Sequence, residues 1–196
     1  ASIAGPGIPA TTYGYDPGGN RISATNSLGD SKQFEYAPGG LLTAIVNPLG
    51  ERQTVVYDAM RRPVELTGAD GRTHSYAWNA RGDLIARTDP DGNQTLMEYD
   101  ADRRLTRTAF PDGTEQTFTY DAGGRLSSAS NETLTLYYAY DPLGRLASIT
   151  DSRGPFVLSY TYDAAGNRAT MTDPAGGVTT YAYDEAGRLS ALSNPA

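Results

Sequence analysis

The side chains that could carry acid–base chemistry in this sequence are one histidine and several pairs of carboxylates. His74 is the only histidine among 196 residues, and cysteine is absent. A hydrolytic triad needs a nucleophile, a base and an orienting acid, and a structural zinc site needs several Cys or His ligands. A lone histidine completes neither set. We therefore assign no catalytic residues, no cofactor-binding residues, no metal ligands and no cofactor.

Acidic residues occur in close pairs, as at Asp89 and Asp91 and at Asp100 and Asp102. In a glycosidase two carboxylates face each other across a cleft. These pairs instead fall in stretches expected to form turns, where Asp has a structural use. Calcium binding by Asp89, Asp91 and Asn93 is the alternative that the residue types allow, although their spacing does not follow that of a known calcium loop.

The turns belong to a repeat that runs through the chain. An aromatic residue recurs at steps of 20 to 22 residues, at Tyr15, Tyr36, Tyr57, Trp78, Tyr99, Tyr120, Tyr140, Tyr162 and Tyr183. Such a fixed period indicates an architecture in which each unit buries its apolar face against its neighbours. We predict a single array over residues 1–196, with about nine repeats cut from a longer chain.

Each repeat contains the motif Tyr-Asp-x-x-Gly, which is intact at residues 15–19, 120–124, 140–144, 162–166 and 183–187. The Asp side chain can accept a hydrogen bond from the backbone two residues later, and Gly can adopt a positive φ. We expect seven aspartates to cap turns and not to act as acids: Asp16, Asp58, Asp100, Asp121, Asp141, Asp163 and Asp184. Ala37 and Asn79 replace the Asp, and Arg61 and Arg103 replace the Gly.

The stretches between turns have the composition and alternation of short β-strands. After the motif, Arg-Leu or Asn-Arg precedes small and β-branched residues, and alternation places Leu146 and Ser148 on one face and Ile149 on the other. A second turn with Pro and Gly follows. The return strand then ends in two apolar residues on one face, such as Tyr138 and Tyr140.

The predicted fold class is therefore all-β, with tandem β-hairpin repeats of about 21 residues forming a continuous antiparallel, spiralling sheet. Two strands in each of nine repeats give on the order of 18 strands, too many for a sheet to stay flat. Equivalent aromatic residues of successive repeats would form stripes of stacked rings.

Arginine provides 15 of the 16 basic residues and recurs four positions after the turn aspartate, at Arg62, Arg104, Arg125, Arg145 and Arg188. A ladder of exposed Asp–Arg pairs would contribute little to stability in water. We favour the alternative that Arg supports the turns through bidentate bonds to Asp or to backbone carbonyls.

Composition excludes several other classes of function. The formal net charge of −7 is unfavourable for binding the phosphates of nucleic acid. No window of 18 apolar residues could span a membrane, and residues 1–10 lack the basic start and apolar core of an export signal.

The linked pattern of Tyr-Asp-x-x-Gly-Arg-Leu, Asp-Pro-x-Gly and an aromatic pair resembles the YD repeats of RHS proteins, toxin-complex subunits and teneurins, over nearly the whole chain. The resemblance implies the wall of a hollow β-shell, which encloses a C-terminal toxin polypeptide in bacterial members and supports cell adhesion in teneurins. Bacterial shells usually end in a self-cleaving segment rich in Asp-Pro-x-Gly. Residues 141–144 come nearest to it, and a turn role is sufficient for them.

We expect a shell-wall segment that is not an enzyme, in a secreted or cell-surface bacterial protein. Its partners would be an enclosed polypeptide or further repeats of the same chain. One alternative is an extracellular adhesion or carbohydrate-binding surface built on exposed Tyr and Asp. Another is a structural fibre in which neighbouring subunits join through open strand edges.

Overall fold

The computed structural model describes residues 2–3 and 11–194, and every regular element in this part of the chain is a β-strand. None of these residues forms a helix that could cross a membrane. The predicted all-β class is confirmed. The chain has two compact units, residues 1–96 and 97–196, with the boundary inside strand β10 (Gln94–Tyr99).

The first unit carries nine strands before β10 within its described residues. These are β1 (Ser2–Ile3), β2 (Thr11–Tyr15), β3 (Arg21–Thr25), β4 (Ser31–Ala37), β5 (Leu41–Val46), β6 (Arg52–Tyr57), β7 (Pro63–Thr67), β8 (Thr73–Trp78) and β9 (Leu84–Thr88).

The second unit carries nine strands after β10 within its described residues. These are β11 (Leu105–Ala109), β12 (Glu115–Tyr120), β13 (Leu126–Ser130), β14 (Thr135–Tyr140), β15 (Leu146–Asp151), β16 (Val157–Tyr162), β17 (Arg168–Thr172), β18 (Val178–Tyr183) and β19 (Leu189–Ser193).

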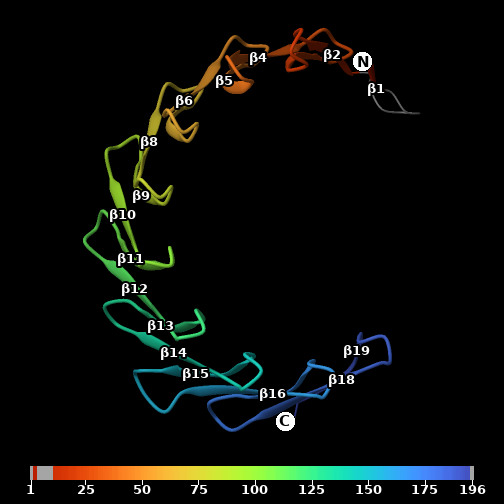
Figure 1. Ribbon diagram of the computed structural model, residues 1–196. Coiled ribbons are helices and arrows are strands. Elements are labelled where there is room, and N and C mark those ends of the chain that lie inside the picture. Colours follow the sequence, from red (N-terminus) through yellow and green to blue (C-terminus); the bar gives the residue numbers. More distant parts are fainter. Residues whose placement is uncertain (1, 4–10, 195–196) are drawn as a thin grey trace. The chain divides into compact units, whose positions relative to one another are not determined.

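Within each unit, a strand pairs antiparallel with the next strand of the sequence, as β4, β5 and β6 do, and as β14, β15 and β16 do (Figure 1). The sheet is thus a succession of hairpins, as the repeat predicts. The coiling of the sheet and the extent of one array over residues 1–196 stay predictions.

Among the described residues, a β-bulge interrupts the register of eight hairpins that carry the Tyr-Asp motif or its variant. In the hairpin of β14 and β15, Tyr140 lies opposite Leu146, whereas Ala139 lies opposite Ser148. Ala147 is the extra residue on the second strand. A bulge of this kind bends the strand and increases its twist.

The bulge changes which side chains share a face. Tyr138 lies opposite Ile149, and residues directly opposite each other in an antiparallel pair project to the same side. Leu146 and Ile149 therefore lie with the two tyrosines, and Ser148 lies on the other side. The prediction that Leu146 and Ser148 share a face was wrong, because strict alternation takes no account of an inserted residue.

The two faces of the sheet differ in polarity, and neither is deeply buried. The aromatic pairs lie on one face. Of the three buried apolar residues in the described chain, Phe34 lies on this face, whereas Ala44 and Ala86, opposite Glu35 and Ala77, lie on the other. The opposite face has hydroxyl pairs across neighbouring strands, such as Thr67 with Thr73 at 2.9 Å. With so little complete burial, stability must also come from contacts along the sheet.

Candidate functional site

The structural unit that recurs along the chain is a turn held by an aspartate. In the repeat of β12 and β13, Asp121 Oδ1 accepts hydrogen bonds from the backbone N–H groups of Gly123 and Arg125, both at 2.9 Å. Asp121 Oδ2 accepts two more, from Arg125 Nε and Nη2, each at 2.7 Å. The backbone closes the turn, since Gly124 N–H donates to the Asp121 carbonyl at 2.9 Å.

The other motif aspartates make the same bonds. Asp58, Asp100, Asp141 and Asp184 each accept from the Arg four residues later. In two repeats an asparagine takes the place of this arginine, and Asn20 and Asn167 donate their amide to Asp16 and Asp163. The prediction that the aspartates cap turns is confirmed. The arginines support those turns as expected. In four of the turns, Nε and Nη2 of the arginine both approach the same carboxylate oxygen, Oδ2.

The repeats that depart from the motif keep the turn by other means. Asn79 Oδ1 accepts from the backbone N–H groups of Arg81 and Asp83, and its amide donates to Asp83 Oδ2 at 2.9 Å, so amide and carboxylate exchange positions. Arg61 and Arg103 stand where other repeats have Gly, and they adopt the same left-handed conformation, with φ of 64° and 66°. These positions require the conformation whatever residue occupies them.

In four of the described turns, the arginine also contacts an aromatic ring of the repeat that follows. The guanidinium of Arg125 lies over the ring of Tyr140, 4.5 Å from the ring centre, and the Tyr140 hydroxyl donates to the Leu126 carbonyl at 2.9 Å. Arg104 with Tyr120, Arg145 with Tyr162 and Arg62 with Trp78 make the equivalent ring contacts. We call this recurring set the Asp–Arg–aromatic ladder. The expected aromatic stripes are therefore interleaved with guanidinium groups.

Repeats with Asn-Arg in place of Arg-Leu use a different ring. Arg168 lies 5.5 Å from the ring centre of Tyr160 and 4.9 Å from that of Tyr181. Arg21 likewise lies over Tyr13 and Phe34. These rings belong to the first aromatic of each pair and not to the motif tyrosine. Sequence reasoning missed this second use, and the shift of Arg by one position was the signal that could have revealed it.

Hydrogen bonding lowers the pKa of the turn carboxylates below the ordinary range. For Asp121 the cause is first the side chain of Arg125 and then its backbone N–H. For Asp163 the leading cause is the Asn167 side chain, partly opposed by desolvation. These groups are ionised at neutral pH and have no proton to donate as general acids.

The carboxylates considered for a calcium site form similar contacts. Asp89 accepts from the backbone N–H groups of Asp91 and Asn93 and from the Asn93 amide, each at 2.9 Å. Asp91 pairs with Arg72 at 2.6 Å. Within residues 2–3 and 11–194, no three or more His, Asp or Glu side chains form a group that could hold a metal ion. The alternative of a calcium site at Asp89 finds no support in this geometry.

The profile of the RHS Repeat family matches residues 38–73, 78–115, 104–135, 120–155, 140–178 and 162–196. The chain belongs to the RHS repeat family. Its ladder of turns is accordingly a structural RHS repeat scaffold. No curated protein sequence is significantly similar to this chain.

Several solved structures share this fold. The Photorhabdus luminescens Tc holotoxin pore matches 95% of this RHS chain with a TM-score of 0.61 and 15% identity. Crystal structures of TcdB2–TccC3–TEV and of TcdB2–TccC3 without its hypervariable C-terminal region each match with a TM-score of 0.56 and 16% identity, over 97% and 93% of this chain. The chain spans only 13% to 15% of the length of these three. At such identity the likeness concerns the fold alone.

Proposed function

We propose that this RHS chain is a segment of the wall of a β-shell that encloses a toxin or effector polypeptide. The observation that carries the proposal is that the motif residues of successive repeats bind groups of their own turn and of the next repeat. Asp121, for example, binds only groups within its own turn, and Arg125 extends from that turn to Tyr140. Repetition of such a unit makes an extended wall.

Absence of enzymatic activity is part of the proposal. A single active site has no need of seven equivalent aspartates, whereas a wall needs each of its turns. Purified protein should show no hydrolysis of ester, amide or glycoside substrates that depends on one of the seven motif aspartates. If Asp121→Ala left stability unchanged and abolished a reproducible turnover, the scaffold proposal would fail.

The fold also supports a secreted or cell-surface bacterial location, because one solved structure of similar fold is the Photorhabdus luminescens Tc holotoxin pore. The partners would be the enclosed polypeptide and further repeats of the same chain. An adhesion or carbohydrate-binding surface and a structural fibre remain the alternatives, and they predict a glycan-dependent binding signal and filaments, respectively.

Protection from protease in the full-length protein tests the enclosing role. We expect a segment outside the repeats to resist proteinase K under native conditions and to be cleaved after denaturation. Substituting Val for Gly124 and Gly144 together, which distorts two turns of the wall, should expose that segment. Equal cleavage of all segments outside the repeats in the native unmodified protein would overturn the proposal.

A further inference from the structure

One repeat of the first unit lacks the first aromatic ring of its pair. The equivalent positions in the repeats around it hold Phe34 and Tyr76, whereas Val55 stands between them in sequence on β6. A valine fills much less volume than a phenyl or phenol ring. The aromatic face is therefore expected to be hollow at this repeat.

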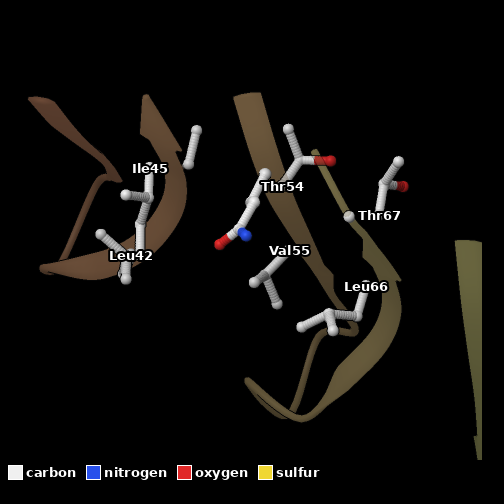
Figure 2. Close-up of a pocket in the computed structure, with 9 residues that line it drawn as sticks. Leu42, Ile45, Thr54, Val55, Leu66 and Thr67 are labelled. Carbon is white, nitrogen blue, oxygen red and sulfur yellow. The ribbon is translucent and has the colours of Figure 1, made fainter. Parts of the chain in front are cut away.

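The structure has a hollow at this place, with a volume of about 190 Å³. Leu42 and Ile45 of β5, Val55 of β6 and Leu66 of β7 supply its apolar lining (Figure 2). A cavity of about 150 Å³ lined by aliphatic side chains binds benzene in another protein. The hollow is thus large enough for one aromatic ring, and its lining is suited to one.

A second, polar pocket of about 490 Å³ adjoins the hollow, because Leu66 and Gly68 line both. Arg87 lines the polar pocket and is exposed. Within the described part of the chain the Arg87 side chain makes no hydrogen bond, ion pair or ring contact. The buried Nδ1 atom of His74, in the same pocket, also has no hydrogen-bonding partner.

The other cation of the polar pocket is already paired, and the carboxylates that line the pocket are hydrogen-bonded within their own turns. Arg72 pairs with Asp91 at 2.6 Å, and Asp89 accepts three hydrogen bonds within its turn. Asp70 Oδ1 accepts the backbone N–H of Arg72 at 3.1 Å. Arg87 is therefore the cation of this pocket whose charge is open to an outside anion.

We propose that the hollow and the polar pocket together bind a polypeptide segment in which an aromatic residue is followed two positions later by a carboxylate. In an extended peptide, residues i and i+2 project to the same side, roughly 7 Å apart. Val55 and Arg87 lie on β6 and β9, three strand spacings apart and offset by two residues along the strand, which makes about 16 Å. The extended side chains of the aromatic residue, of the acid and of Arg87 together span the difference. The ring fills the place left by Val55, and the carboxylate pairs with Arg87.

Titration of the full chain with the tripeptide acetyl-Phe-Gly-Glu-amide, followed by methyl NMR, tests the proposal without any variant. We expect saturable shifts at the methyl groups of Leu42, Ile45 and Leu66. Shifts that concentrate on another part of the chain would overturn the site. So would the lack of saturable shifts up to about 10 mM peptide, a concentration that detects even millimolar binding.

Variants then assign the two halves of the site. Val55→Phe fills the hollow and should weaken binding at least about tenfold, whereas Val56→Phe, on the opposite face and already 48% exposed, should not. Arg87→Gln should weaken the binding of acetyl-Phe-Gly-Glu-amide about threefold to fivefold and leave the binding of acetyl-Phe-Gly-Gln-amide unchanged. Equal affinity of Val55→Phe and the unmodified chain for the peptide would contradict the proposal. So would equal affinity of the unmodified chain for acetyl-Leu-Gly-Glu-amide and acetyl-Phe-Gly-Glu-amide.

The proposal rests on the proposed function only for the source of the segment, namely the enclosed polypeptide. The two can fail separately. Binding of the peptide at Leu66, together with complete protease sensitivity in the full-length protein, would retain the site and reject the enclosing role. Protection of the enclosed segment without any peptide binding would retain the wall and reject the site.

Discussion

The guanidinium of Arg125 lies 4.5 Å from the centre of the Tyr140 ring, and it holds Asp121 of its own turn at 2.7 Å. One side chain thus connects a turn to the return strand of the next repeat. In a repeat protein, stability is approximately the sum of the stability of each unit and of the contacts between neighbours. The Asp–Arg–aromatic ladder supplies both kinds of contact.

Removing the hydroxyl of a ladder tyrosine should weaken the link between repeats. Tyr140→Phe keeps the ring beside Arg125 but loses the hydrogen bond to the Leu126 carbonyl, and we expect a cost of about 0.5 to 1.5 kcal/mol. Tyr140→Trp should cost less, because Trp78 makes the equivalent bond to the Pro63 carbonyl at 2.8 Å. Urea unfolding measures both, and equal stability of the Phe variant and the unmodified chain would contradict the role of the bond.

The turn aspartate should tolerate asparagine better than alanine. Asp121→Ala removes the acceptor of two backbone N–H groups, and we expect the melting temperature to fall by about 3 °C. Asp121→Asn keeps an acceptor oxygen, as Asn79 does in its own turn, and its melting temperature should fall less. Thermal unfolding followed by circular dichroism makes the comparison. An Asn variant as unstable as the Ala variant would mean that the charge, and not the cap, holds the turn.

A branched side chain at the closing glycine should be far more harmful than loss of an exposed arginine. Gly144 has a φ of 82°, and a Cβ there would lie 3.2 Å from Arg125 Nη1, so Gly144→Val should cost about 1 to 3 kcal/mol. Arg153 pairs with Asp151 but is 59% exposed, so Arg153→Ala should cost much less. Equal urea midpoints would refute the turn assignment.

Acid should destabilise the protein through the turn carboxylates. Because the pKa of Asp121 is lower in the folded state, chiefly through the Arg125 side chain, the unfolded chain binds more protons as the pH falls. This stabilisation is complete above the unfolded pKa of about 3.9 and is lost as the pH falls through the lower folded pKa. Urea midpoints should therefore hold steady from neutral pH to about pH 5 and decline below about pH 4.

The matched control for the acid prediction is Asp121→Asn, which has no proton to gain at this position. Its decline between about pH 4 and pH 2 should be shallower than that of the unmodified chain. A midpoint that stays constant down to about pH 2 would show that the turn carboxylates do not couple protonation to folding.

The sequence by itself determined the hairpins and their turns. Asp121 and Gly124 each have a local reason to be where they are, because the cap and the positive φ involve atoms within five residues of each other. The partner of Arg125 in its own turn could be predicted for the same reason. Local geometry repeats wherever the local sequence repeats, so the period alone gave the fold class.

Only the tertiary structure decided which residues meet across strands. Ala147 is bulged out, and this places Leu146 and Ile149 beside the tyrosines in a register that alternation cannot predict. The hollow beside Val55 and the unpaired Arg87 likewise depend on neighbouring strands. The physical reason is that a turn is fixed by bonds along the chain, whereas a face or a pocket is fixed by the register between strands. One inserted residue changes that register and leaves the sequence pattern almost unaltered.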